Sequence, residues 1–369
     1  MSHGDGGATV IDPERQPSEN GLQQPSEAQS AFLQARQRRK ITELEEKIET
    51  LESGRASKER QTNYYLAQGR GIRRIVSLFD SIEDLVSEND RKYDDNFNDE
   101  DMATFDQDHL QTGYDILTRT LPWIVKQSSD MDHDEYICMI KMLRQGADGA
   151  RGDDTSKLRT LVADWVNRDL KPNPLVDPDD KHSRGFINDA CGKLLCPAEL
   201  DWNNPVTKTG IRDHSQAFLY EKYTANLDNL EAGLFKGQIL VQGYKAVFTS
   251  PSSAKDIDGD GDGADVIKNN RRAKKAGWGL KVKKHVAQII KMEKVTPRSI
   301  AYIACQVRFA LSSITSWRTV DGDFDYVQFW RSIVDFFERP PGREAQRRVN
   351  KLLEWWNRHR THTDTVNKP

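Results

Sequence analysis

Residues 296–317, TPRSIAYIACQVRFALSSITSW, decide the fold class of this chain. The Thr296 side chain can cap a helix, and Pro297 suits the first helical position, where no intrahelical N–H bond is made. The residues that follow are mostly apolar on all sides, which is typical of a helix buried inside a domain. We therefore predict a central buried helix that begins at Pro297.

Further helices are expected on both sides of this core helix. The stretch DYVQFWRSIVDFFE, residues 325–338, ends before two prolines, which cannot continue a helix. Residues 342–360 form an amphipathic pattern whose apolar side holds Val349, Leu352, Leu353 and Trp356. On the N-terminal side of the core helix, the spacing of apolar residues from Leu227 to Val247 predicts another helix.

Helical periodicity also marks the N-terminal half, where predicted helices start near Gly71 and cover residues 109–119, 134–144 and 155–170. Between the last two, the run QGADGARGDD predicts a turn because it is rich in glycine. The paired acids Asp153 and Asp154 in this run are better suited to cap a helix than to act as general acids.

Other stretches oppose long helices. Asp90 to Asp108 is dominated by Asp, Asn and Glu, which predicts an exposed acidic loop. Prolines 172, 174 and 178 indicate a subdomain boundary, and glycines and prolines throughout 180–225 leave room only for loops and a few short strands. The fold class that we predict is therefore all-α or predominantly α.

This pattern divides the chain into six segments. They are a disordered tail at 1–30, a coiled-coil-like helix at 31–60, an N-terminal helical half at 62–170, a loop-rich connection at 171–225, a C-terminal helical half at 226–360 with a charged insertion at 252–294, and a tail at 361–369.

Composition excludes several classes of protein. The formal charge is −3, the mean hydropathy is −0.76, and the longest apolar run is far shorter than a membrane span. Four cysteines are too few for a dense disulfide scaffold, and Cys138 and Cys305 lie among apolar helix residues, which predicts that both are core. The N-terminus lacks the pattern of a signal peptide. We therefore expect an intracellular protein, in the nucleus or the cytoplasm, with no membrane contact.

Residues 36–60 carry a short coiled-coil pattern. Ile41, Leu44, Ile48 and Leu51 are spaced by 3, 4 and 3 residues, as in the a and d positions of a heptad repeat. The pattern predicts self-association or a protein partner. Because only two heptads are clear, a solvated helix packed on the main domain is an equal alternative.

The string DIDGDGDGAD, residues 256–265, resembles the start of an EF-hand loop. Position 12 of such a loop must supply a bidentate carboxylate, but the two registers place Ile267 or Asn269 there. We therefore expect a flexible acidic loop rather than a calcium site.

The basic tract, Lys268 to Lys294, holds ten Lys or Arg residues and one Glu. Such a cluster attracts phosphates or acidic peptides, and a tryptophan within it can stack on a base. Two basic pairs ten residues apart also match a bipartite nuclear-import signal. A solvated loop, or one neutralised by the acidic residues 80–108, remains an alternative. The candidate contact residues are Arg271, Arg272, Lys274, Lys275, Trp278, Lys281, Lys283 and Lys284.

Signatures of catalysis and of metal binding are weak. Cys191 and Cys196 lie near His182 and His214, but the second close pair of a zinc site is missing. The sequence has no nucleophile elbow, phosphate-binding loop or zinc-protease motif. We expect no cofactor and no metal, and the runner-up to a binding function is an enzyme with a site around 180–220, built on His182, Asp201 and His214.

Several strings together resemble a family of unknown function that is associated with mushroom-forming basidiomycete fungi. These strings are GRGIRRIVSLFDSIEDLV, GADGARGDDTSKLRTLVADWVN, LLCPAELDW, FTSPSSAKD, VTPRSIAYIACQVRFALSS and LLEWWNR. The resemblance covers about residues 62–360 and implies no catalytic or binding residue. On the residues themselves, we expect a helical protein that works by binding rather than by catalysis.

Overall fold

The computed structural model describes residues 27–93, 104–204, 216–249 and 286–361. Its α-helices are α1 (Glu27–Gly69), α2 (Ile72–Ile75), α3 (Ile82–Lys92), α4 (Phe105–Thr120), α5 (Ile124–Asp130), α6 (His133–Leu170), α7 (Asp189–Leu195), α9 (Gln238–Tyr244), α11 (Val286–Ile289), α12 (Pro297–Leu311), α13 (Tyr326–Glu338) and α14 (Gly342–Thr361). Short 3₁₀ turns are η1 (Gly185–Ile187), η2 (Ala217–Leu219) and η3 (Glu221–Tyr223), and η4 (Lys245–Thr249) is a π-helical turn. Strands β1 (Val320–Asp321) and β2 (Phe324–Asp325) pair antiparallel.

The predominantly α-helical fold is therefore confirmed. The residues divide into two units, Met1–Arg60 and Gln61–Pro369, and helix α1 continues across the division. The second unit holds the helical domain. No helix in the described ranges is long and apolar enough to cross a membrane.

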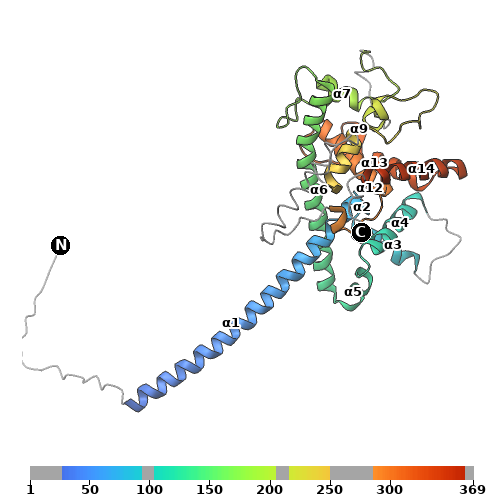
Figure 1. The fold of residues 1–369 in the computed structure, drawn as a ribbon. Coiled ribbons are helices and arrows are strands. Elements are labelled where there is room, and N and C mark those ends of the chain that lie inside the picture. The colour runs from blue at the N-terminus through green and yellow to red at the C-terminus, as the bar shows by residue number, and fades with distance from the viewer. Residues whose placement is uncertain (1–26, 94–103, 205–215, 250–285, 362–369) are drawn as a thin grey trace, which may run out of the picture. The chain divides into compact units, whose positions relative to one another are not determined.

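Helix α12 is the core of the helical domain, as its sequence predicts. Thr296 and Ser299 form a reciprocal capping box, Pro297 occupies the first turn, and every residue from Arg298 to Leu311 is buried. Helices α6, α9 and α13 pack against α12, and Figure 1 shows them gathered around it. The predicted end of α13 before the two prolines and the predicted start of α14 after them are also confirmed.

The predicted turn at residues 145–154 is wrong, because α6 runs without a break from His133 to Leu170. A Cβ added at Gly146 would lie 2.1 Å from the carbonyl oxygen of Leu66 in α1, and one at Gly69 would lie 2.1 Å from the carbonyl oxygen of Leu143 in α6. The two glycines thus let helix backbones pass in direct contact, so glycine marks a close crossing here rather than a turn.

The prediction that Asp154 caps a helix is also wrong. Asp154 lies in the middle of α6 and is buried, and its carboxylate accepts hydrogen bonds from Nε of Arg74 at 2.7 Å and from the hydroxyl of Tyr302 at 2.8 Å. Its neighbour Asp153 is exposed and pairs with Arg70 at the surface. A one-residue step around the helix therefore separates a core ion pair from a solvated one.

Three smaller expectations also differ from the structure. The stretch from Leu227 is turns rather than helix until α9 begins at Gln238, and Leu227 itself is exposed. Cys138 is exposed because it lies on the outer side of α6, whereas Cys305 is buried as predicted. In the described part of 180–225, strand-like pairing is limited to isolated bridges such as Pro197 with Gln216.

Candidate binding cleft

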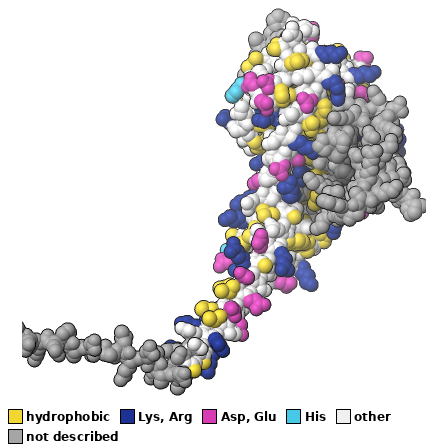
Figure 2. All heavy atoms as spheres, turned by 60° about the vertical axis from the view of Figure 1, so that its left-hand side comes forward, with side chains coloured by type: hydrophobic (Ala, Val, Ile, Leu, Met, Phe, Trp, Pro, Cys, Tyr) yellow, Lys and Arg dark blue, Asp and Glu magenta, His cyan; other side chains and the backbone are white. Residues whose placement is uncertain are grey.

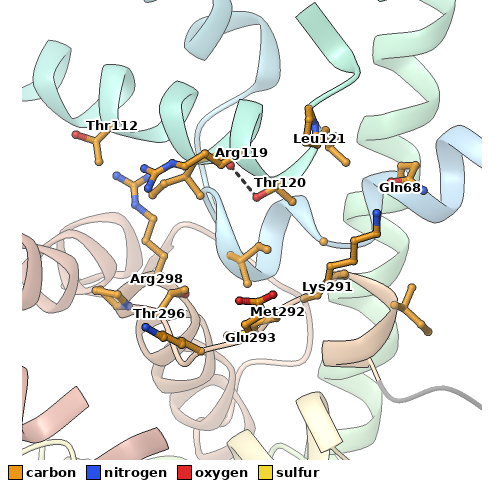
Figure 3. Close-up of a pocket in the computed structure, with 18 of the residues that line it drawn as sticks. Gln68, Thr112, Arg119, Thr120, Leu121, Lys291, Met292, Glu293, Thr296 and Arg298 are labelled. Carbon is orange, nitrogen blue, oxygen red and sulfur yellow. Dashed lines mark hydrogen bonds between the residues drawn. The ribbon is translucent and has the colours of Figure 1, made fainter. Parts of the chain in front are cut away.

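A cleft of about 1030 Å³ lies in the helical domain between segments that are far apart in the sequence. Its N-terminal wall comes from residues 64–75 and 112–123, and its C-terminal wall from residues 289–298 and 338–339. We call this space the basic cleft. Figure 3 shows Arg119 and Arg298 toward one side, Lys291 on the other, and Glu293 between them.

Two helix-end signals fix the segment between Ile290 and Thr296. Helix α11 ends at Ile289, and Lys291 in the turn that follows has a left-handed φ of 53°. The backbone N–H groups of Met292 and Lys291 donate to the carbonyl oxygens of Ala287 and Gln288, which matches a Schellman motif. The capping box of Thr296 then starts α12. Between these ends Met292 is buried, whereas Lys291, Glu293 and Lys294 are exposed.

The opposite wall is aromatic. Helix α4 ends at Thr120, because Pro122 cannot continue it. The turn that follows places the centroid of the Trp123 ring 5.6 Å from that of the Tyr64 ring. Ile290 packs against the backbone at Gly71, where an added Cβ would lie 3.1 Å from its side chain. The cleft therefore combines an apolar wall with a charged edge.

Arg298 is a structural residue although it lines the cleft. It is buried, and its guanidinium donates to Glu338 at 3.1 Å and 3.2 Å and to the carbonyl oxygen of Val76 at 2.7 Å. Burial and then the charge of Arg298 lower the pKa of the adjacent His109 imidazole to about 3, so His109 is neutral at physiological pH. This part of the lining holds α12, α13 and α4 together.

Three other cations of the cleft have no such partner. Arg119, Lys291 and Lys294 are exposed and make no ion pair in the part of the chain that the structure describes. Arg119 donates Nε to the carbonyl oxygen of Asp115, which leaves its charge unneutralised. The one lining carboxylate outside the Arg298 pair is that of Glu293. The charge available to a ligand is therefore positive.

Chemically, this arrangement favours binding. The lining combines apolar and aromatic side chains with cations, which suits an anionic molecule that also carries apolar groups. Within the described ranges, no group of three or more His, Cys, Asp and Glu residues is arranged to hold a metal ion.

A second cavity, of about 260 Å³, lies in the region of the predicted runner-up site. Its polar lining includes Gln216, Arg308, Ser312, Ser313 and Asp321. Arg308 is buried and donates to Asp321 at 3.3 Å and to the Tyr326 hydroxyl at 2.7 Å. In the described residues, Nε of Arg308 and Oε1 of Gln216 are buried without a hydrogen-bond partner.

Two titratable groups near this cavity are also perturbed. Burial and the nearby charge of Arg184 lower the pKa of Lys181 to about 7, and its ammonium donates to the Phe309 carbonyl oxygen at 2.5 Å. Burial raises the pKa of the Cys191 thiol to about 11, so this thiol stays protonated and is a poor nucleophile and metal ligand at neutral pH.

Most of the residues predicted from sequence as functional lie outside the residues that the structure describes. Arg271, Arg272, Lys274, Lys275, Trp278, Lys281, Lys283 and Lys284, as well as the acidic string 256–265, lie outside the described residues. His182 and Asp201 are exposed and do not line the small cavity, and His214 is outside the described residues. Lys291 and Lys294 belong to the basic tract, which the sequence marks by its charge. Arg119 and Trp123 carry no such sequence signal, because only the tertiary fold brings them to the same cleft.

Comparison with known proteins places the chain in a family. No curated protein and no solved structure matches the chain. A family model described as a family of unknown function, DUF6698, matches residues 145–359, which is more than half of the chain. The matched range includes the C-terminal wall of the basic cleft but not the N-terminal wall, residues 64–75 and 112–123. The chain therefore belongs to the DUF6698 family.

Proposed function

We propose that this chain is a binding protein whose basic cleft takes an acidic segment of a partner protein. The observation that carries the proposal is the contrast within one lining: Arg119, Lys291 and Lys294 have no ion pair in the described part of the chain, while Arg298 in the same cleft is fully engaged. Exposed unpaired cations around an apolar wall attract acidic residues that alternate with apolar ones.

The other anionic partner that the basic tract predicts is a nucleic acid. The mixed lining of the cleft favours a polypeptide. Ile116 and Ile289 add aliphatic surface beside the Trp123 ring, and the Leu or Phe side chains of a peptide can pack on both kinds of surface, whereas bases stack on the aromatic ring alone. Residues 268–284 of the basic tract precede the C-terminal wall of the cleft in the sequence. Their positive charge adds to the long-range attraction of an acidic partner.

Fluorescence anisotropy tests this proposal with two probes, a labelled peptide that mixes Glu with Leu and Phe, and a single-stranded oligonucleotide. The triple variant Arg119→Ala/Lys291→Ala/Lys294→Ala should bind the peptide at least about tenfold more weakly, since each lost charge contact contributes roughly 0.5 to 1 kcal/mol. The control variant Lys141→Ala/Lys193→Ala/Lys351→Ala removes equally exposed cations outside the cleft and should bind normally. Equal losses in both variants, or tighter binding of the oligonucleotide, would contradict the proposal.

We also propose nuclear import through the two basic pairs of the tract. The support is their spacing of ten residues between Arg272 and Lys283. Alanine at Arg271, Arg272, Lys283 and Lys284 in a fluorescent fusion should shift the protein from the nucleus to the cytoplasm. An unchanged distribution would leave the tract with a role in partner binding alone.

An enzyme remains the second candidate, and the small cavity under Arg308 supports it. Arg308 and Gln216 each carry a buried polar atom without a hydrogen-bond partner among the described residues, and both line a space large enough for a small polar molecule. Thermal-shift screening of small polar compounds tests this candidate, and a hit counts only if Gln216→Ala abolishes the shift.

Two further proposals concern the rest of the chain. Residues 36–60 mediate self-association, since the apolar side chains of the predicted heptads are exposed. The family resemblance extends from residue 145 back to about Thr62, and the family is associated with mushroom-forming basidiomycete fungi. A search of fungal and other genomes with residues 62–144 would test both the extension and its range.

A further inference from the structure

We infer that residues 38–52 of α1 form a parallel, two-stranded coiled coil with a second copy of this chain. The inference rests on the proposed self-association and adds its stoichiometry and direction. The contact surface is the Ile/Leu seam, which we define as Ile41, Leu44, Ile48 and Leu51. Three observations support it, namely exposure, the identity of the seam residues and the placement of charge.

The Ile/Leu seam is open to solvent in the single chain. Ile41, Leu44 and Ile48 are 54%, 49% and 53% exposed, and Leu51 is 72% exposed. Figure 2 shows apolar side chains spaced along this helix between charged ones. Four large aliphatic side chains in a row on one helix face are unfavourable in water, and the helix gains stability when they are buried.

The identity of the seam residues favours a coiled coil of two helices. In the heptad register, Ile41 and Ile48 occupy the a positions, and Leu44 and Leu51 occupy the d positions. A β-branched residue at a with Leu at d is the combination that packs best in parallel dimers, because each side chain then fits the hole formed by the facing helix.

The charges beside the seam select the parallel direction. Lys40 and Lys47 fall at g positions, and Glu45 and Glu52 fall at e positions. A parallel pair brings each g residue beside the e residue of the next heptad in the second copy, so Lys40 faces Glu45 and Lys47 faces Glu52. An antiparallel pair would bring g beside g and e beside e, which places Lys against Lys and Glu against Glu.

An intrahelical contact does not oppose this arrangement. Lys47 donates to Glu43 at 2.6 Å in the same helix, but both side chains are more than 60% exposed. Such a solvated pair is weak, so Lys47 can turn to Glu52 of the second copy with little loss. Glu43 lies at an outer c position and stays in solvent.

The length of the seam is limited at both ends by polar residues in the core positions. Gln34 and Gln37 precede it, and Arg55 and Lys58 follow it. Two heptads bury little apolar surface, so the dimer should be weak and concentration-dependent rather than obligate.

Sedimentation of the full chain over a wide range of concentration tests the inference. The wild type should change from monomer to dimer with rising concentration. Lys40→Glu/Lys47→Glu should raise the dissociation constant about tenfold or more, since every cross-chain attraction becomes a repulsion. The control Arg36→Glu/Arg39→Glu makes the same charge change on the outer face and should have little effect. Adding Glu45→Lys/Glu52→Lys to the first variant should restore the dimer.

The outcomes separate self-association from its geometry. A monomer at all concentrations would overturn both. A dimer that is indifferent to Lys40→Glu/Lys47→Glu would overturn the parallel arrangement alone, because an antiparallel pair merely exchanges Lys–Lys for Glu–Glu contacts. Disulfide trapping in a Cys138→Ser background tests the direction independently. In a parallel pair, Gln37→Cys of one copy should cross-link to Gln37→Cys of the other. Cross-linking only between Gln37→Cys chains and Arg55→Cys chains would show an antiparallel pair.

Discussion

Cations gather in two regions of the helical domain, the interior around α12 and the basic cleft, and they behave differently in each. The interior arginines are at most 4% exposed. Three of them bind a carboxylate: Arg74 binds Asp154, Arg298 binds Glu338 and Arg308 binds Asp321. The fourth, Arg184, donates instead to four backbone carbonyl oxygens. In the cleft, by contrast, Arg119, Lys291 and Lys294 are exposed and make no ion pair in the described residues.

This difference separates structural charge from charge that is free to bind. A buried guanidinium without hydrogen-bond acceptors would lose its hydration with nothing in exchange, so the domain folds only because carboxylates or backbone carbonyl oxygens bind the interior arginines. The cleft cations keep their hydration in the single chain, and a partner can neutralise them without breaking any internal contact. Changes in the interior should therefore affect folding, and changes in the cleft should affect binding.

The largest effect on stability is expected for Asp154→Ala. It leaves the buried Arg74 charge and the Tyr302 hydroxyl without their carboxylate, which should lower the free energy of unfolding by about 3 to 5 kcal/mol. Asp153→Ala is a matched control in the same helix, because its carboxylate pairs with Arg70 at the surface, and it should lower that free energy by less than about 1 kcal/mol. Urea unfolding measures both, and similar losses would contradict the distinction between the two pairs.

A smaller effect is expected for Lys181, a buried cation that has no direct carboxylate partner in the described residues. Because its pKa is lowered to about 7 in the folded chain, the unfolded chain binds more protons between pH 7 and pH 10.5. Stability should therefore rise with pH, by about 1.5 kcal/mol from pH 7 to pH 8.5. Lys181→Met should remove this rise, and urea midpoints at both pH values would show it. Parallel pH profiles for the two proteins would refute the role of Lys181.

The smallest effect on stability is expected in the cleft. Arg119→Ala and Lys294→Ala remove exposed side chains without ion pairs in the described part of the chain, so each should change the free energy of unfolding by no more than about 0.5 kcal/mol. Chemical denaturation of both variants checks this expectation. A loss as large as that of Asp154→Ala would mean that the cleft cations support the fold.

Much of the fold could be predicted from local signals. The capping box at Thr296, the apolar run after it and the prolines after Glu338 each act within one turn of helix, so sequence alone locates α12 and the end of α13. The continuity of α6 could not be predicted. Gly146 makes room for the backbone of α1 at Leu66, and only the tertiary fold sets where α1 lies. Glycine alone does not distinguish a turn from a close crossing.

The candidate site was less predictable than the fold. Charge density pointed to the basic tract, which includes Lys291 and Lys294, but no local pattern connects them to Arg119 and Trp123. These residues meet because Pro122 ends α4 beside the segment fixed by Lys291 and Thr296. Such a meeting depends on contacts across the whole domain, and a single sequence carries no record of them.

Hydrogen–deuterium exchange of the full chain, with and without the acidic peptide, tests most directly the central claim that the basic cleft is the binding site. We expect slower amide exchange on both walls, in residues 112–123 and 289–296, when the peptide is bound. The Arg119→Ala/Lys291→Ala/Lys294→Ala variant should lose this protection at the same peptide concentration. Protection confined to residues 268–284, with both walls unchanged, would contradict the claim and leave the basic tract as the binding element.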